Sequence, residues 1–314
     1  MPLPSGIHLV ELPLPFDLGT LNVYLLRRGE RFVLIDAGMD TPECFAALQL
    51  GLEAAARAGP AVSGWNRIDE LVVSHYHPDH VGLAPRLLRL SGARLRIAPV
   101  ESRALAAASD IAAAEQWERG ILDDAGVPAL LVGQIELAMR PVRSAFCRLP
   151  PDLPAGAGEC IPADAGEFEI VVTPGHSPGH LCLYNRRHRL LFSGDHMLEK
   201  ISPHISWQPG FDALGDYLDS LRAIAELDVD LVLPSHGRPF HGSRAWIARA
   251  IETHQRRCGQ LEEALARSPA TPFELTRVLW PRPLPPFHLR FAIFETLAHL
   301  EHLRRGSGPA TDSA

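Results

Sequence analysis

Residues 74–82 constrain this chain more than any other stretch, because they concentrate metal-binding side chains in one place. They read Ser-His-Tyr-His-Pro-Asp-His-Val-Gly and follow directly on the apolar run at residues 71–73. Alternate residues of an extended chain point the same way, so His75 and His77 can bind one metal ion together. Packing alone is a poor explanation for three histidines and an aspartate at this spacing, beside a buried strand.

The second half of the same stretch predicts a second ion. Pro78 cannot continue the strand and favours the start of a helix. Asp79 and His80 then fall in the first helical turn and point away from the first pair. Six residues cannot close two metal sites, so further ligands have to come from other parts of the chain.

The remaining candidate ligands recur at the ends of later strand-like runs. His176 follows the run near residue 172, Asp195 follows residues 190–192, and His236 follows residues 231–233. In each case a glycine, proline or serine flanks the ligand and lets the backbone come close. A single Gly-His or Gly-Asp pair is common and predicts little. Their recurrence at several strand ends predicts metal ligands.

The order of the elements predicts an α+β fold with two sheets. Strand-like runs of branched apolar residues come in two batches, each mixed with helical patterns, which indicates packed sheets with helices outside. The expected strands are residues 7–12, 21–26, 32–35, 71–74, 95–98, 168–173, 181–184, 190–192 and 231–233. The expected helices include residues 81–90, 213–227 and a broken alanine-rich pattern over 101–137. Residues 141–166 are rich in proline and glycine and predict a long loop, either a cover over the site or an irregular connection.

From Ser243 onward the pattern is helical only, which predicts a division into residues 1–242 and a helical domain of residues 243–314. Helices are expected at residues 243–266, 272–279 and 289–304. This tail holds ten arginines against seven acidic residues, while the whole chain of 314 residues has a net charge of −7. The acidic balance argues against a nucleic-acid platform over the whole surface.

Composition and the cysteine pattern favour a cytoplasmic protein. Apolar residues make up 46% and charged residues 21% of the chain, as in soluble globular proteins. No apolar run is long enough to cross a bilayer, and the N-terminus lacks the pattern of a signal peptide. The five cysteines form no Cys-x-x-Cys pair, which is typical of a reducing compartment.

Taken in order, the motifs His-x-His-x-Asp-His, Gly-His, Gly-Asp and Ser-His-Gly resemble those of the metallo-β-lactamase superfamily, over about residues 21–242. The resemblance implies an αβ/βα sandwich with a dinuclear zinc site at one edge. It further implies that Asp36 is a structural or outer residue and that Asp195 bridges both ions. The implied first site is His75, His77 and His176, and the implied second site is Asp79, His80 and His236.

Differences within the superfamily narrow the expected activity. The commonest zinc β-lactamases have a cysteine where Asp195 stands, so antibiotic hydrolysis is not expected as the main activity. A ligand set of nitrogen and oxygen atoms with a bridging aspartate looks more like that of glyoxalase-II-type thioesterases, lactonases and the nucleases of the superfamily. The helical tail resembles the winged-helix-like C-terminal domain of a branch that includes an endoribonuclease acting on single-stranded RNA, although no wing strands are evident.

The leading hypothesis is a dinuclear-zinc hydrolase that uses metal-bound hydroxide to cleave a small ester or thioester, as hydroxyacylglutathione hydrolases and lactonases do. Asp79 is the candidate catalytic residue, orienting the nucleophile as it ligates. The alternative is an endoribonuclease that holds single-stranded RNA with its tail. A mononuclear iron persulfide dioxygenase and a non-catalytic scaffold rank lower.

Several points stay open at this stage. Nitrogen and oxygen ligands suit iron and manganese as well as zinc. The apolar faces of the tail helices would also suit a homodimer, whereas no membrane partner is expected. His196, Lys200 and His204 follow Asp195 without an evident role, and His180 is not expected to be a ligand.

Overall fold

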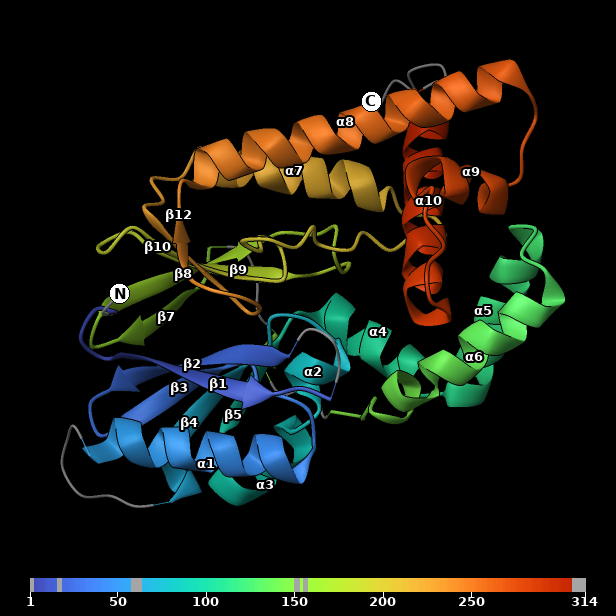
Figure 1. Cartoon of the computed structure of the whole chain (residues 1–314). Coiled ribbons are helices and arrows are strands. Elements are labelled where there is room, and N and C mark those ends of the chain that lie inside the picture. Colours follow the sequence, from blue (N-terminus) through green and yellow to red (C-terminus); the bar gives the residue numbers. More distant parts are fainter. Residues whose placement is uncertain (1–2, 16–18, 58–63, 150–152, 155–157, 307–314) are drawn as a thin grey trace, which may run out of the picture.

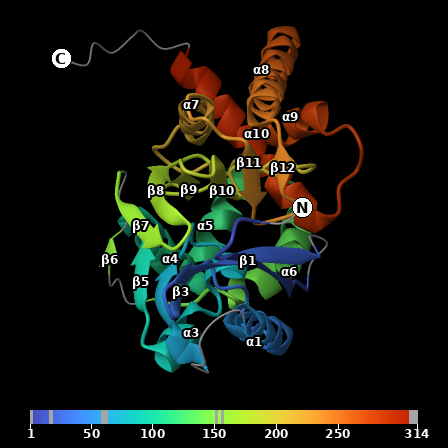
Figure 2. The same ribbon diagram turned by 90° about the vertical axis from the view of Figure 1, so that its left-hand side faces the viewer.

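Two mixed β-sheets pack face to face, with helices covering both outer surfaces (Figure 1). The computed structural model describes residues 3–15, 19–57, 64–149, 153–154 and 158–306. Figure 2, which shows the same ribbon from the side, has the layers stacked in the order helix, sheet, sheet, helix. The α+β sandwich predicted from the sequence is thus confirmed.

The first sheet has six strands and is antiparallel at one edge and parallel at the other. Neighbours up to β3 pair antiparallel, and from β3 onward the pairing is parallel. Strand β3 is buried on both faces after Arg31, which explains its continuous apolar run, whereas β5 alternates arginine with buried apolar residues. The strands are β1 (Ile7–Pro13), β2 (Thr20–Arg28), β3 (Arg31–Ile35), β4 (Ile68–Val72), β5 (Arg94–Ile97) and β6 (Leu153–Pro154).

The second sheet also has six strands, in the order β12-β11-β10-β9-β8-β7. Its pairs are antiparallel except β10 with β11, which run parallel and are joined through α7. The strands are β7 (Cys160–Ala163), β8 (Gly166–Val172), β9 (Leu181–Asn185), β10 (Leu190–Gly194), β11 (Leu231–Pro234) and β12 (Phe240–His241).

Side-chain caps mark the start of some of the helices. Asp212 accepts a hydrogen bond from the Gly215 amide at the start of α7, and Thr271 with Glu274 forms a capping box on α9. A short 3-10 helix lies at Trp65–Arg67. The α-helices are α1 (Pro42–Arg57), α2 (Pro78–Val81), α3 (Ala84–Ser91), α4 (Pro99–Ala108), α5 (Ile111–Asp124), α6 (Ala129–Ser144), α7 (Ala213–Ala225), α8 (Ser243–Arg267), α9 (Pro272–Leu279) and α10 (Pro286–Gly306).

Three apolar cores correspond to the three contacts between layers. Tyr24, Phe168 and Phe192 lie in the core between the two sheets. A second core joins the first sheet to α1 and α3, and a third joins the second sheet to α7 and the first turns of α8. Burying each large apolar side chain contributes roughly 1.5–3 kcal/mol, so the inner core holds the two sheets firmly together beneath the site.

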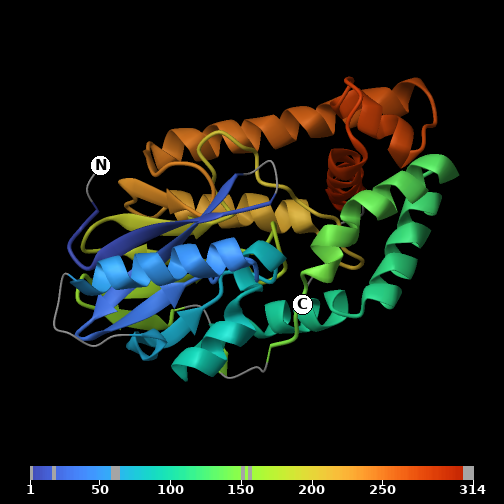
Figure 3. The same cartoon turned by 60° about the horizontal axis from the view of Figure 1, so that its bottom comes forward.

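A fourth core lies outside the sandwich. Helices α4–α6 extend away from the sheets toward the C-terminal helices (Figure 3). There Leu122, Val132 and Ile135 pack against Ile293 and Phe294 of α10. The C-terminal helices therefore bridge the second sheet and the α5–α6 arm. None of the described helices is both long and apolar enough to span a membrane.

Several predicted elements need correction. Residues 141–166 do not form one long loop: α6 continues to Ser144 with Pro141 inside it, and β6 and β7 follow. The proline, glycine and alanine content hid these elements because β6 and β7 are short and lie at sheet edges. Residues 150–152 and 155–157 of that predicted loop lie outside the described residues. The helix expected at 81–90 is present as α3, which begins at Ala84, and the short helix α2 precedes it from Pro78. The alanine-rich pattern has a further break at Ser109 and Asp110.

The helices expected in the tail are present as α8, α9 and α10. No strand occurs between residues 243 and 306, all of which the structure describes. The boundary at residues 242–243 stays a prediction, because α8 packs directly on α7 in the same core as the second sheet.

Candidate metal centre

The ends of several strands meet at one edge of the sandwich and bring the predicted ligands together. Residues 74–80 follow β4, and His176, Asp195 and His236 follow β8, β10 and β11. The backbone ties these loops to one another across the two sheets. The Leu181 amide donates to the Ser74 carbonyl, and the Asn22 amide donates to the Ser235 carbonyl.

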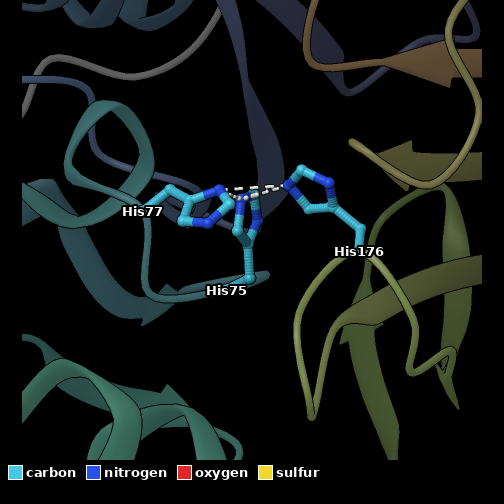
Figure 4. Close-up of side chains that lie close together, drawn as sticks. All are labelled: His75, His77 and His176. Atoms are coloured by element: carbon cyan, nitrogen blue, oxygen red, sulfur yellow. Dashed lines mark hydrogen bonds between the residues drawn. The ribbon is translucent and has the colours of Figure 1, made fainter. Parts of the chain in front are cut away.

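Three histidines converge in the first half of the site (Figure 4). His75 Nε2 lies 2.9 Å from His77 Nδ1, and His176 Nε2 lies 3.2 Å and 3.0 Å from these two atoms. Nitrogen ligands held tetrahedrally around Zn²⁺ at about 2.0–2.1 Å would lie about 3.3 Å apart. A shift of a few tenths of an ångström would therefore let one ion enter between them.

A second group lies beside the first and consists of Asp79, His80 and His236. Asp79 Oδ2 is 3.3 Å from His236 Nε2 and 3.7 Å from His80 Nε2. Asp195 lies between the groups. One of its oxygens is 3.6 Å from His176 Nε2, and the other is 3.4 Å from His80 and 3.5 Å from His236. All seven predicted ligands thus face one small volume.

Hydrogen bonds on the far side of each ring fix which nitrogen faces inward in the second group. Asp36 Oδ2 lies 2.8 Å from His80 Nδ1, and the Thr20 carbonyl lies 2.9 Å from His236 Nδ1. Metal-binding histidines commonly use their second nitrogen in this way. Asp36 has a structural role here, because it binds His80 and also accepts hydrogen bonds from the amide and the hydroxyl of Ser74. Its backbone has a positive φ of 60°.

The first group has similar outer partners. His176 Nδ1 is 2.8 Å from the His204 carbonyl, and His75 Nδ1 is 3.0 Å from Ser74 Oγ. His204, to which the sequence assigned no role, therefore orients a candidate ligand through its backbone.

Unpartnered atoms at the centre fit a bound cation. His80 Nε2, His236 Nε2 and Asp195 Oδ1 are buried and form no hydrogen bond of normal geometry with any residue that the structure describes. Buried polar atoms without a partner are rare in native proteins and carry a free-energy cost. Their donor types, imidazole nitrogen and carboxylate oxygen, are ligands of zinc, iron and manganese alike.

The two halves differ in charge. Burial, together with the neighbouring imidazoles, lowers the pKa of His75 and His77 well below the ordinary value, so both are neutral. Burial acts against ionisation of Asp195, but His236 and His80 outweigh it and hold the pKa of Asp195 well below its usual range. For His236 burial is likewise outweighed, chiefly by Asp195, and the pKa rises to about 10. The carboxylates are thus ionised and available as ligands at neutral pH.

His180 positions Asp195 through the backbone. The Asp195 amide donates to His180 Nε2 over 3.2 Å, while His180 Nδ1 lies 2.8 Å from Thr173 Oγ1. A Cβ on Gly194, whose φ is +50°, would lie 2.5 Å from His180 Nε2, so glycine is needed there. His180 is not one of the residues in the converging groups.

The two other residues without a role lie away from the converging ligands. His196 is buried against Tyr217 at a ring distance of 4.7 Å, and burial lowers its pKa to about 3. Lys200 lines a groove of about 180 Å³ beside α8, together with Arg249 and Trp246. The sequence did not single out Glu101, a buried carboxylate in the first turn of α4 that contacts two of the ligand loops.

Known proteins match most of this chain at 27–30% identity. The family model described as "Metallo-beta-lactamase superfamily" matches residues 17–236, and "Metallo-beta-lactamase-like, C-terminal domain" matches residues 258–308. The Bacillus subtilis protein named "Probable metallo-hydrolase YqjP" is 27% identical, with 94% of this chain and 91% of that protein covered. "Acyl-coenzyme A thioesterase MBLAC2" of Gallus gallus is 28% identical, with 78% and 82% covered.

A solved structure matches over nearly the whole chain. The metallo-beta-lactamase family protein TTHA1429 from Thermus thermophilus superposes with a TM-score of 0.82 at 30% identity. The match covers 97% of this chain and 94% of that one, so it includes the C-terminal helices as well as the sandwich.

Proposed function

Because the chain belongs to the metallo-beta-lactamase superfamily and is a metal-dependent hydrolase, we propose that it hydrolyses a small ester or thioester at a dinuclear metal centre. Zinc is the proposed metal, with iron and manganese as alternatives that the same donors accept. The proposed ligands of the first ion are His75, His77 and His176, those of the second are Asp79, His80 and His236, and Asp195 is shared by both.

The position of Asp195 between two complete groups supports a dinuclear centre more than any other observation. Its two oxygens face different groups, one toward His176 and the other toward His80 and His236. A single ion would leave one group of buried, inward-facing atoms without a partner.

Bound ions would polarise the carbonyl of the substrate and lower the pKa of a water molecule enough for attack near neutral pH. The chain itself supplies the geometry. Asp195 lies between the two groups and can contact an ion in each. The outer hydrogen bonds of His80, His236 and His176 keep the ligand nitrogens directed inward.

Asp79 is the proposed catalytic residue. Its side chain is 16% exposed and that of Asp195 is 10% exposed, so it is the more accessible of the two carboxylates. Burial opposes its ionisation, but His80 outweighs burial and lowers the pKa of Asp79 to about 2. The ionised carboxylate can therefore accept a hydrogen bond from the attacking water and orient it.

The choice of a thioester is supported by the relative from Gallus gallus, whose name describes an acyl-coenzyme A thioesterase. The donor set is also consistent with this choice, because a metal-activated water needs no serine or cysteine nucleophile on the chain.

The test is turnover of purified, metal-quantified protein on four substrates: an acyl-coenzyme A, an S-acyl glutathione, an acyl lactone and labelled single-stranded RNA. We expect thioester or lactone hydrolysis that is lost on chelation, restored by Zn²⁺, Fe²⁺ or Mn²⁺, and absent from Asp195→Ala. Cleavage confined to RNA would replace the proposed function with that of a nuclease. Hydrolysis that survives both chelation and Asp195→Ala would rule out the metal centre as its cause.

A further inference from the structure

The three histidines of the first group come from two loops that are far apart in the sequence. His75 and His77 follow β4, whereas His176 lies in the loop between β8 and β9. Their ring nitrogens are only 3.0–3.2 Å apart. The backbone hydrogen bond from Leu181 to Ser74 joins the two loops at their bases. A further contact, nearer the ligands, is needed to fix the separation of the three rings.

The carboxylate of Glu101 lies between these loops and bonds to both. One oxygen accepts a hydrogen bond of 2.8 Å from the backbone amide of Tyr76, the residue between His75 and His77. The other accepts from the hydroxyl of Ser177, over 2.8 Å, and from the backbone amide of Gly179.

The surroundings of Glu101 allow little adjustment. Its side chain is fully buried, at 0% exposure. A Cβ on Gly179 would lie 2.2 Å from Val100 Cγ1, so the second loop lies tightly against the start of α4. Pro99 occupies the first turn of that helix and fixes the backbone from which Glu101 projects.

Glu101 does not form an ion pair that would explain its burial. No arginine, lysine or histidine within the described residues lies at ion-pair distance from its carboxylate, unlike Glu70 or Glu118. Burial raises the pKa of Glu101 to about 7 despite its hydrogen bonds. A buried carboxylate with three neutral donors and no cation is costly for fold stability alone.

We propose that Glu101 is a positioning residue whose carboxylate sets the separation between the His75–His77 loop and the His176 loop, and thereby the affinity for the first metal ion. This inference rests on the proposed metal centre. Glu101 does not contact the ion. It acts on the ligands through the backbone beside them.

The chemistry of the contact explains why glutamate is needed. Three donors face the two oxygens, so every position around the carboxyl group has to accept a hydrogen bond. Glutamine has the same shape, but its amide nitrogen would face either the Tyr76 amide or the Ser177 and Gly179 donors. Aspartate keeps the charge but is one methylene shorter and cannot reach both loops.

The experiment measures Zn²⁺ affinity and stoichiometry by competition with a chelating dye, independently of any substrate. We expect Glu101→Gln to bind one of two ions roughly 10- to 100-fold more weakly, the range seen for outer partners of metal ligands. Affinity for the other ion should change little. Ser177→Ala removes one of the three donors and should give a weaker loss, about fivefold.

Glu70→Gln is the matched control. Glu70 is also a buried glutamate, on β4, but it pairs with Arg28 and Arg96 away from the ligand loops. This variant should have a lower Tm and unchanged Zn²⁺ affinity.

Three outcomes are distinguishable. Wild-type affinity for both ions in Glu101→Gln and in Ser177→Ala would overturn the role of Glu101, whatever happens to Tm. Ser177→Ala gives the answer if Glu101→Gln does not fold. A wild-type chain that binds no Zn²⁺, Fe²⁺ or Mn²⁺ would instead remove the metal centre on which the inference rests.

Discussion

Two clusters in this molecule are both built from buried histidines and carboxylates, but their nitrogen and oxygen atoms have different partners. One is the candidate metal centre. The other, here called the tail cluster, consists of His254, Glu295 and His299, which are buried between α8 and α10 and could by type hold an ion.

The tail cluster is closed by its own hydrogen bonds. His254 Nδ1 lies 3.1 Å from His299 Nε2, and His299 Nδ1 lies 2.7 Å from the backbone carbonyl of Glu295. The carboxylate of Glu295 pairs with Arg257. With His299 donating from Nδ1, its Nε2 can accept from His254, so both bonds are satisfied without a cation.

The metal centre has the opposite arrangement. Its outer nitrogens are bonded to the protein, whereas three inner atoms, His80 Nε2, His236 Nε2 and Asp195 Oδ1, form no hydrogen bond of normal geometry with any described residue. The comparison teaches that a group of histidines and a carboxylate does not make a metal site by itself. Whether the cluster can bind an ion depends on which ring nitrogens the protein already binds and which stay free to face the ion.

The largest expected effect comes from deleting one histidine from each cluster. His236→Leu should reduce bound zinc from two ions to one, whereas His254→Leu should leave two. Loss of one ion removes several kcal/mol of transition-state stabilisation, so kcat/KM should fall by roughly 1000-fold in His236→Leu. Metal analysis by mass spectrometry and turnover of the best substrate check both. Loss of an ion from His254→Leu would show that the tail cluster binds metal after all.

A smaller effect is expected on stability, and here the tail cluster is the sensitive one. His254→Leu leaves His299 Nε2 buried without its partner, which should lower the free energy of unfolding by about 1–3 kcal/mol. Urea unfolding in the presence of a chelator measures this without a contribution from bound metal. The exposed His288 of the same domain is the control, and His288→Leu should change stability by less than about 0.5 kcal/mol. Equal losses in the two variants would contradict a satisfied hydrogen bond at His254.

The smallest effect is the pH dependence of stability that His254 contributes. Burial and the neighbouring His299 lower the pKa of His254 to about 3 in the folded chain, below the ordinary value of 6.5 that applies after unfolding. Between these values the unfolded chain binds a proton that the folded chain does not. The contribution of His254 to stability therefore falls as pH drops below 6.5, by up to about 1.4 kcal/mol per pH unit.

His254→Leu lacks this contribution. The difference in unfolding free energy between wild type and variant should therefore shrink by about 1 kcal/mol between pH 7.5 and pH 5.5. Chelated protein is used at both pH values, so that the metal ligands do not add a difference of their own. A difference that stays constant would mean that His254 titrates alike in both states.

The family resemblance, the α+β sandwich and the assignment as a hydrolase could all be predicted from the sequence, and the comparisons and the structure confirm them. The candidate ligands could be named because each sits next to a strand end, flanked by residues that make a tight turn. Such signals are local, so they can be recognised without knowing which distant residues pack against them. That these residues bind two ions stays a prediction.

Other features carried no local signal. Glu101 reads as an ordinary acidic residue in the first turn of a helix, where such residues are favoured in any case. The role of the His204 carbonyl could not be read from a side chain at all. The predicted loop over residues 141–166 was wrong because β6 and β7 form by pairing at sheet edges, and edge pairing depends on distant strands more than on composition.

The sequence by itself determined which groups could bind a metal. The donor type is given by each residue, and its position at a strand end is predicted from the residues next to it. Only the tertiary structure decided which nitrogens face a common point and which are already satisfied, since tautomer and ring direction depend on partners far away in the chain. Asp36 for His80, Thr20 for His236 and Glu101 for the two loops are such partners. The same dependence closed the tail cluster, where His299 turns one nitrogen to its own helix and the other to His254.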